Sequence, residues 1–401
     1  MSGTPIAWYV KSIEVDGLGG RSETYQQSLN PDVNVFFGLN GSGKTTLLKI
    51  IHAALNGEIS PLIGAPFTRA TVKIEIPEDG ATIERSIVVP DSEALSADFR
   101  RALPASIRNR RGASPRYESL LKEVFDWETS VFAQDRKARG FYSNQPPGGV
   151  HSFRHRYLPT SRLIDMREMQ TPVGPEWSFD EYFADSIQRL WASYSTEVLT
   201  GVRKAQEDGL GRILTGVISP SEVSHPAKEL DPNQAYLRVA SFLKRRKTER
   251  LVQSEDEFLR RFSSDSAFKR VVIDINEVEE QIELALEPRT KLEKLVQGLI
   301  SGPKQIDFGD TQIRVIAADS REISLDRLSS GEKQLIRILV ETLAARGRPI
   351  IIDEPELSMH IDWQNVLIES IQTMDSTAQV ITATHSPEIM AEIDDEKIFR
   401  L

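Results

Sequence analysis

A glycine-rich run near the start of the chain has the residue types that bind nucleotide phosphates. Residues 34–37 before it predict a short buried strand, and apolar residues at helical spacing after it predict a helix. A glycine-rich turn at a helix N-terminus points backbone N–H groups at one place, where they stabilise a phosphate. The run is Gly38-Leu39-Asn40-Gly41-Ser42-Gly43-Lys44-Thr45-Thr46, which fits the pattern G-x-x-x-x-G-K-[ST]. We expect Asn40 to Thr46 to bind the nucleotide, with Lys44 on the β- and γ-phosphates and the Thr45 hydroxyl on Mg²⁺.

Two further strands near the end of the sequence finish in residues that suit phosphate chemistry. Residues 349–356, Pro-Ile-Ile-Ile-Asp-Glu-Pro-Glu, predict a buried strand that ends in adjacent carboxylates. Such a pair suits nucleotide hydrolysis, with Asp353 holding Mg²⁺ and Glu354 orienting the attacking water. A second apolar run, 379–384, ends at His385, which we expect to contact the γ-phosphate or the water.

A Ser-Gly pair precedes the helical pattern that begins near residue 331. The stretch reads Leu328-Ser329-Ser330-Gly331-Glu332-Lys333-Gln334, and Ser330 with Gly331 at a helix N-terminus makes a second anion site. The same residues could be no more than a helix cap. His151 and His155 are four positions apart, but their Gly/Pro context and the missing acidic neighbours speak against a metal site.

Composition limits the class of protein. The 401 residues exceed one ordinary core, so we expect two lobes or a domain with a large insertion. The absence of cysteine excludes disulfides, thiolate catalysis and cysteine-ligated zinc. No apolar run reaches membrane-spanning length and the N-terminus lacks a signal pattern, so we expect a cytoplasmic protein with no membrane partner. The net charge is −10, yet residues 99–162 carry 13 Lys/Arg against 5 Asp/Glu, a local +8.

The periodicity predicts an α/β core interrupted by helices. Strands at 8–15 and 33–37 and a hairpin at 67–90 describe an α/β core beside an antiparallel sheet, and strands return at 304–308 and 312–317. Between them, from Ser178 to about Gly298, we expect helices of about 12–22 residues, the last of them ending at Pro288. No heptad persists, so this region is predicted to be a compact arm rather than a long coiled coil. The predicted divisions are 1–164, 165–302 and 303–401.

The motifs, in this order along the chain, resemble those of the ABC-type ATPases. The resemblance covers about residues 6–90 and 304–401 and implies an ABC-type P-loop ATPase head, with a mixed sheet, an antiparallel β-subdomain and a helical insertion. It also implies ATP and Mg²⁺ as cofactors and a head-to-tail dimer, or a higher oligomer, that holds two ATPs. By this resemblance Ser330 and Gly331 contact the γ-phosphate of ATP on the other subunit, and Leu357-Ser358-Met359-His360 is the dimer-contact loop.

Two elements of that family are less well marked in this sequence. Gln134 is the candidate for the family's glutamine loop, which would place it on the nucleotide and on Mg²⁺. The adenine contact has no assigned residue, and Arg21 to Tyr25 is the region in which we look for it.

Spacing favours one branch of the family. Lys44 and Gly331 are 287 positions apart. This spacing leaves room for the helical insertion of SMC-like, RecF-like and OLD-like proteins, and it is longer than the spacing expected of transporters. The sequence Glu-Pro-Glu-Leu-Ser-Met-His from Glu354 looks more like the OLD-like group, although only 16 residues follow His385, too few for its TOPRIM nuclease. Residues 157–162 are similar to ATPase subunits of bacterial anti-phage systems, such as PtuA of Septu and AriA of PARIS.

Three functions remain open at this point. The first is an ATPase that acts as sensor or switch for a separate effector, a nuclease or toxin, in anti-phage defence. The second is a DNA-repair or chromosome-maintenance ATPase that binds nucleic acid through the basic residues of 100–116 and 244–247. The third is a scaffold that binds ATP and hydrolyses it slowly.

Overall fold

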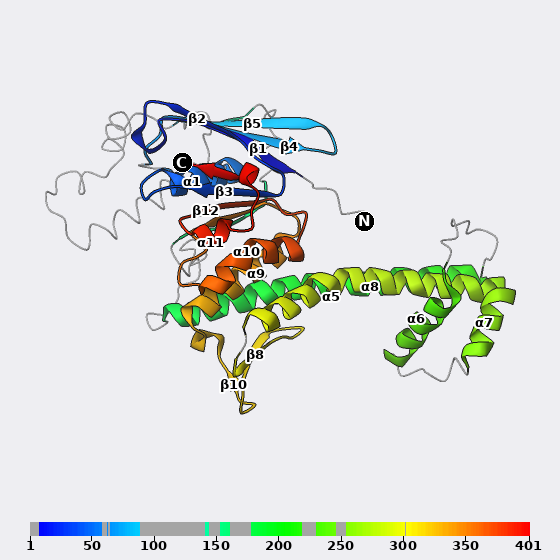
Figure 1. Ribbon diagram of the computed structural model, residues 1–401. Coiled ribbons are helices and arrows are strands. Elements are labelled where there is room, and N and C mark those ends of the chain that lie inside the picture. Colours follow the sequence, from blue (N-terminus) through cyan, green and yellow to red (C-terminus); the bar gives the residue numbers. More distant parts are fainter. Residues whose placement is uncertain are drawn as a thin grey trace, which may run out of the picture. The chain divides into compact units, whose positions relative to one another are not determined.

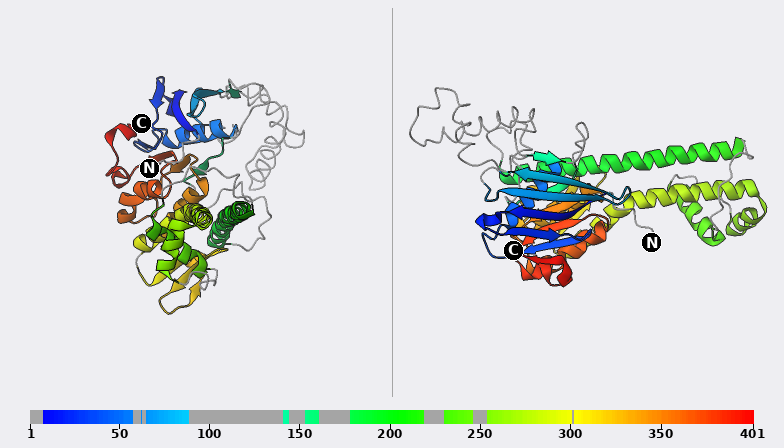
Figure 2. Two further views of the ribbon diagram at one scale, coloured as in Figure 1. Left: turned by 90° about the vertical axis from the view of Figure 1, so that its right-hand side faces the viewer. Right: turned by 90° about the horizontal axis from the view of Figure 1, so that it is seen from above.

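The computed structural model describes most of the chain as two compact units. The described residues are 8–57, 62, 65–88, 141–143, 153–160, 178–218, 230–245, 254–300 and 302–401. One unit comprises Met1–Phe183 with Asp326–Leu401, and the other comprises Ala184–Leu325. Figures 1 and 2 show their elements, coloured along the sequence. Each unit is described by itself below.

A five-stranded sheet carries the chemistry of the first unit. Its neighbouring strands are parallel, and three apolar β-branched residues make up most of the inner strand β11, as expected for a strand covered on both faces. The carboxyl ends of parallel strands meet at one edge, so the residues that follow them come together. In order the strands are β13 (Ile398–Arg400), β3 (Val33–Phe37), β12 (Val380–Thr384), β11 (Ile350–Asp353) and β7 (Arg156–Leu158).

An antiparallel sheet packs on the other side of helix α1 (Lys44–Asn56). Apolar residues of this sheet, of α1 and of the parallel sheet form one buried cluster, which explains why α1 is apolar on nearly every side. The strand order is β2 (Thr24–Ser28), β1 (Tyr9–Asp16), β4 (Arg69–Ile76), β5 (Ala81–Val88) and β6 (Phe141–Ser143). The remaining helices of this unit are α9 (Ser330–Ala345), α10 (Ile361–Met374) and α11 (Pro387–Met390).

Two buried polar side chains tie these layers together. Gln379 accepts from Val10 N at 2.8 Å and donates to Val10 O at 2.9 Å, which joins β12 to β1. Arg85 on β5 is fully buried and donates to the carbonyl oxygen of Leu55 at 3.0 Å in the last turn of α1. A cation at that end of a helix is stabilised by the macrodipole. The expected α/β class, with parallel sheet, antiparallel sheet and helical region, is confirmed.

The second unit differs from its prediction in the length of its helices. Its helix α5 (Phe179–Ile218, beginning in the first unit) has 40 residues and α8 (Ser266–Leu299) has 34, so the expected 12–22 residues are wrong. At the helical rise these are roughly 60 and 50 Å long. The two helices run side by side (Figures 1 and 2), and Arg212 lies 3.8 Å from Glu277 across the pair. The prediction of a compact arm rather than a long coiled coil is therefore corrected to an arm with two long helices.

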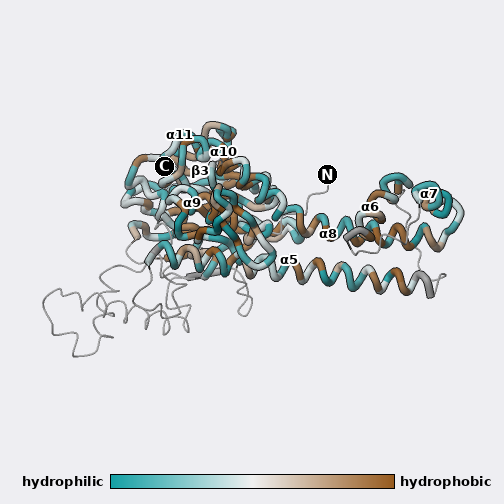
Figure 3. Tube along the Cα trace, turned by 90° about the horizontal axis from the view of Figure 1, so that it is seen from below, coloured by the Kyte–Doolittle hydropathy of each residue, from teal (hydrophilic) through white to brown (hydrophobic). Residues whose placement is uncertain are grey.

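Local stop signals do not end these helices. Pro288 lies inside α8, where it removes the backbone bond to the carbonyl of Leu284. Leu284 is 61% exposed, so water can satisfy that carbonyl. Apolar and polar residues alternate along both helices (Figure 3). Two shorter helices, α6 (Pro232–Arg245) and α7 (Glu255–Ser264), pack with α8 around an apolar cluster of their own.

Gly209 sets how closely α5 and α8 approach. A Cβ added at Gly209 would collide with Val278 Cγ2, whereas one added at Gly201 or Gly211 meets nothing within 4 Å. We expect Gly209→Ala to lower the free energy of unfolding by about 1–3 kcal/mol through overpacking. Gly211→Ala, in the same helix, should raise it by about 0.5–1 kcal/mol. Chemical denaturation followed by circular dichroism measures both, and equal effects would contradict the close approach.

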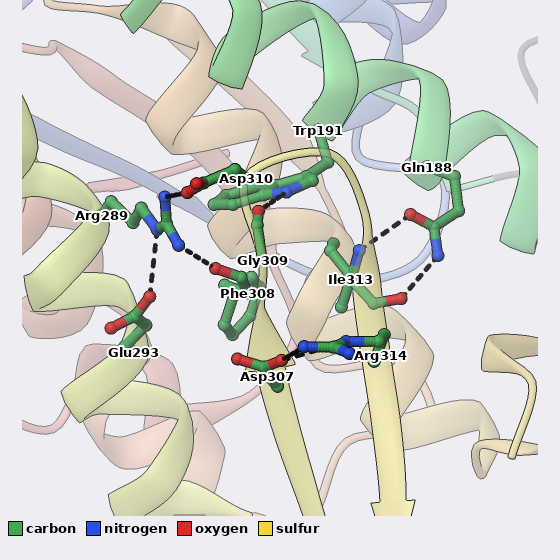
Figure 4. Close-up of polar contacts among 10 residues, drawn as sticks. All are labelled: Gln188, Trp191, Arg289, Glu293, Asp307, Phe308, Gly309, Asp310, Ile313 and Arg314. Atoms are coloured by element: carbon green, nitrogen blue, oxygen red, sulfur yellow. Dashed lines mark hydrogen bonds and ion pairs between the residues drawn. The ribbon is translucent and has the colours of Figure 1, made fainter. Parts of the chain in front are cut away.

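Side chains from α5 and α8 hold the hairpin of strands β8 (Lys304–Phe308) and β9 (Ile313–Ala317), which β10 (Glu322–Ile323) extends (Figure 4). Gln188 accepts from Ile313 N at 2.9 Å and donates to Ile313 O at 2.6 Å. Trp191 Nε1 donates to Gly309 O at 2.8 Å, and Arg289 bonds Asp310 Oδ1 at 2.6 Å. These bonds fix the turn of the hairpin between the two long helices.

A chain of hydrogen bonds joins His52 on α1 to His155, which directly precedes β7. His155 Nδ1 is 2.8 Å from Phe153 O and therefore donates to it, which leaves His155 Nε2 to accept from His52 Nδ1 at 2.7 Å. His52 Nε2 then accepts from Asn56 Nδ2 at 3.3 Å. In this arrangement the His155 ring is neutral. Burial lowers the pKa of His155 from 6.5 to about 4; the hydrogen bond to Phe153 O opposes this shift, and the positive charge of Arg156 adds to it.

Acidification should destabilise the protein through His155. Above pH 6.5 this histidine is neutral in both states and contributes nothing to pH dependence; between 6.5 and about 4 the unfolded chain binds a proton that the folded chain does not. The free energy of unfolding should fall by about 3 kcal/mol across that window. Urea denaturation from pH 7 to 4.5 should show a shallower slope for His155→Gln than for the wild type. Identical slopes would contradict a neutral buried histidine.

Candidate functional site

The phosphate loop joins β3 to α1 in a conformation that requires glycine. Gly41 and Gly43 have φ of 80° and 103°, in the left-handed region. Gly38 admits no side chain because a Cβ there would lie 2.5 Å from Leu401 O. Gly43, the N-cap of α1, makes no side-chain cap, so the N–H groups of the first turn are left to an anion.

The side chain of Lys44 folds back over the phosphate loop. Its ammonium donates to Gly38 O at 2.8 Å and to Leu39 O at 3.0 Å, and the residue is 5% exposed. Burial lowers the pKa of Lys44, and the negative charges of Glu354 and Asp353 partly offset this. A buried ammonium beside a helix N-terminus is suited to neutralise a phosphate.

Asp353 ends β11 directly opposite the loop. Thr45 Oγ1 donates to Asp353 Oδ1 at 3.2 Å, and Thr160 Oγ1 donates to Asp353 Oδ2 at 2.5 Å. Burial raises the pKa of Asp353, and the hydrogen bonds from Thr160 and Thr45 act in the opposite direction. Sequence reasoning did not assign a role to Thr160; the signal was its place two residues after the strand 156–158.

These residues fit Mg²⁺ bound together with a nucleotide. A hydroxyl and a carboxylate are the hard oxygen ligands that Mg²⁺ prefers, and the ion usually takes only one or two protein carboxylates, completing its shell with phosphates and water. Among the described residues no group of three or more His, Asp or Glu could hold a metal ion alone. Thr45 and Asp353 would therefore hold the ion jointly with the phosphates.

The predicted catalytic pair comes together at the ends of two neighbouring strands. Glu354 Oε1 lies 3.4 Å from His385 Nε2, and both side chains are partly exposed. Glu354 has a φ of 51°, in the left-handed region, and its N–H donates to Ala383 O at 2.8 Å. The backbone therefore leaves the extended strand conformation at this residue. The N–H of His385 donates to Glu356 Oε1 at 2.7 Å. A carboxylate and an imidazole are thus held side by side at the sheet edge.

Ser330 and Gly331 begin α9 behind a complete capping box. Ser329 N donates to Glu332 Oε2 at 2.7 Å, and Glu332 N donates to Ser329 Oγ at 3.3 Å. A Cβ at Gly331 would lie 2.5 Å from Ser358 O, so the signature packs on the loop expected to contact a second subunit. Within the described part of the chain no hydrogen bond joins Ser330 or Gly331 to the phosphate loop.

The remaining predicted residues either fall outside the described part of the chain or belong to the region proposed for the adenine contact. Gln134 and residues 100–116 fall outside the described residues, as do 246–247 and the side chains of 244–245. The residues just before Arg21 do adjoin the phosphate loop: a Cβ at Gly19 would lie 3.6 Å from Ser42 O. Tyr25 packs against the core, and burial raises the pKa of its hydroxyl to about 12.

Fold and site together define a P-loop ATPase. A strand, a glycine loop, a lysine, a hydroxyl and a strand-ending carboxylate meet at one sheet edge, as such chemistry requires. The chain belongs to the AAA_21 family, described as "AAA domain, putative AbiEii toxin, Type IV TA system", whose profile matches residues 33–391. The family places the chain among ATPases, as the motifs predicted.

The chain is also similar to one curated relative and to solved structures. "Retron Vc95 probable ATPase" of Vibrio cholerae serotype O1 biovar El Tor is 22% identical over 393 residues, which cover 92% of this chain and 69% of that protein. The Smc head domain with an extended coiled coil from Pyrococcus furiosus is 15% identical and covers 96% of this chain and 91% of its own, with a TM-score of 0.40. The Smc head domain with a coiled coil and joint from Pyrococcus yayanosii is 16% identical, with coverage of 98% and 95% and a TM-score of 0.39. At these TM-scores the structural likeness carries no further weight.

Of the helices that the structure describes, none combines the length and apolarity needed to cross a bilayer.

Proposed function

We propose that this protein is an ATP-driven switch that closes as a head-to-tail dimer around two ATPs and controls a separate effector. The observation that carries the proposal is the meeting of Lys44, Thr45 and Asp353 at one sheet edge, with Glu354 and His385 beside them. Together they supply phosphate binding, Mg²⁺ binding and a base for the attacking water. Hydrolysis by this site would reopen the dimer.

We propose a dimer because the anion site at Ser330 and Gly331 makes no hydrogen bond to the phosphate loop of the same chain, within the described residues. Ser330 and Gly331 begin a helix whose N-terminus favours a phosphate, and within the described residues they make no hydrogen bond to the phosphate loop. In a head-to-tail pair each signature would meet the ATP on the other subunit's loop. The segments 1–164 and 303–401 would then form the ATPase head, and the arm 165–302 would respond to its closure.

The effector is proposed to be a nuclease or toxin in a bacterial anti-phage system. The family description names a toxin of a type IV toxin–antitoxin system, and a relative is named as a retron ATPase. Expression of this chain with its neighbouring genes should protect cells from phage, and the Lys44→Ala variant should not. Lys73→Ala, which removes an exposed lysine on β4, is the matched control. Equal protection by Lys44→Ala would overturn the proposed role.

Direct action on DNA is the competing function, and salt distinguishes it. If residues 100–116 and 244–247 contacted phosphates, DNA affinity would fall steeply between about 50 and 200 mM salt. Fluorescence anisotropy with duplex DNA, with and without ATP, measures this. Salt-dependent binding that needs ATP would favour a repair or chromosome-maintenance function over control of an effector.

A further inference from the structure

The position of Thr160 follows from the order of strands in the parallel sheet. Strand β7 lies beside β11 in parallel register, with Leu158 opposite Ile352. The chain therefore leaves β7 beside the point where β11 ends in Asp353. Pro159 follows and cannot donate to a ladder, which is in keeping with the end of the strand. Thr160 comes next, and its hydroxyl faces the carboxylate.

Asp353 is held between two hydroxyls that come from distant parts of the chain. Thr45 Oγ1 bonds one carboxylate oxygen at 3.2 Å, and Thr160 Oγ1 bonds the other at 2.5 Å. Asp353 is 2% exposed, so solvent contributes little to its orientation. A hydroxyl that donates one hydrogen bond still has lone pairs with which to accept another or to face a cation.

We propose that Thr160 is the positioning residue of the metal site: it fixes the Asp353 carboxylate so that the oxygen shared with Thr45 faces the Mg²⁺ of Mg·ATP. The inference rests on the proposed function, because it concerns the same site. The proposal also puts the segment after β7 beside the metal. The sequence had suggested Gln134 for that position. Groups that orient a metal ligand change metal affinity about 10–100-fold when they are removed.

The test measures metal affinity rather than turnover. Mn²⁺ serves as a spectroscopic probe for Mg²⁺, and its binding to the full chain with ATP is followed by electron paramagnetic resonance. Thr160→Val keeps the shape and removes the hydroxyl, so its Mn²⁺ affinity should fall about 10–100-fold. ATP binding in excess chelator should be unchanged, because Thr160 acts only through the metal ligand. Thr160→Ser, which restores a hydroxyl, should restore the affinity.

Thr382→Val is the matched control. Thr382 is buried on β12, and its hydroxyl donates to Ile352 O at 3.0 Å, so the variant removes an equivalent hydrogen bond to β11 without touching Asp353. Its Mn²⁺ affinity should equal that of the wild type. If Thr160→Val proves unfolded by its melting curve, Thr160→Ala takes its place.

Each outcome of the Mn²⁺ measurements either supports or overturns the proposal. Loss of Mn²⁺ affinity in Thr160→Val alone, with rescue by Thr160→Ser, supports the proposal. Wild-type affinity in Thr160→Val, or an equal loss in Thr382→Val, overturns it and leaves the ATP site intact. A wild-type chain that binds neither ATP nor Mn²⁺·ATP would instead overturn the proposed function and this inference with it.

Discussion

Replacing Glu354 with glutamine should leave ATP binding intact and slow hydrolysis by about 10²–10⁴-fold. Glutamine keeps the shape of the side chain and can still meet His385, which lies 3.4 Å from Glu354. It cannot accept the proton that the attacking water loses. Phosphate release in a single turnover measures the rate, and a fluorescent ATP analogue measures binding.

The same chemical change on the surface of the same unit provides the control. Glu369 is exposed on α10, and Glu369→Gln should hydrolyse ATP at the wild-type rate. If Glu354→Gln also hydrolysed ATP at that rate, the assignment of the catalytic carboxylate would be wrong. A loss of binding in Glu354→Gln would instead show that this carboxylate shapes the site.

Replacing Lys44 with alanine should weaken ATP binding by about 10²-fold or more. Lys44 is 5% exposed, and its ammonium is held over the loop by the carbonyls of Gly38 and Leu39. There it would make charge-assisted bonds to phosphate, each contributing about 1.5–3 kcal/mol, and no other side chain of the loop carries a positive charge. Isothermal titration with ATP and Mg²⁺ measures the loss.

Lys73→Ala again removes a lysine without touching the loop, since Lys73 is an exposed residue of β4 paired with Glu84 at 3.8 Å. It should bind ATP as the wild type does. Wild-type affinity in Lys44→Ala would show that this lysine does not contact the nucleotide. A melting curve shows whether Lys44→Ala remains folded.

Local motifs predicted the centre of the site because each lies at the end of a strand. The loop at Gly38–Thr46 and the pair Asp353-Glu354 depend on a few consecutive residues, and parallel strands then bring their ends to one edge. Thr160 could not be found in this way. Its role depends on β7 lying beside β11, which brings Thr160 to Asp353, 193 positions away in the sequence. No local pattern encodes that pairing.

The lengths of the helices in the second unit could not be predicted from the sequence for a different reason. A proline and three glycines, Pro288 with Gly201, Gly209 and Gly211, favour short helices when each is considered alone. Gly209 instead allows α8 to approach, and the break at Pro288 falls beside an exposed residue. The lengths of these two helices therefore do not follow from local propensity alone.

The proposed switch depends on a composite site, and the molar mass of Glu354→Gln tests it most directly. With ATP and Mg²⁺ this variant should sediment as a dimer, and without nucleotide as a monomer. Adding Ser330→Arg should abolish the ATP-dependent dimer, because a large cationic side chain would stand where the partner's phosphate is expected. A variant that stays monomeric with ATP, or that dimerises equally well with Ser330→Arg, would contradict a site shared between two subunits.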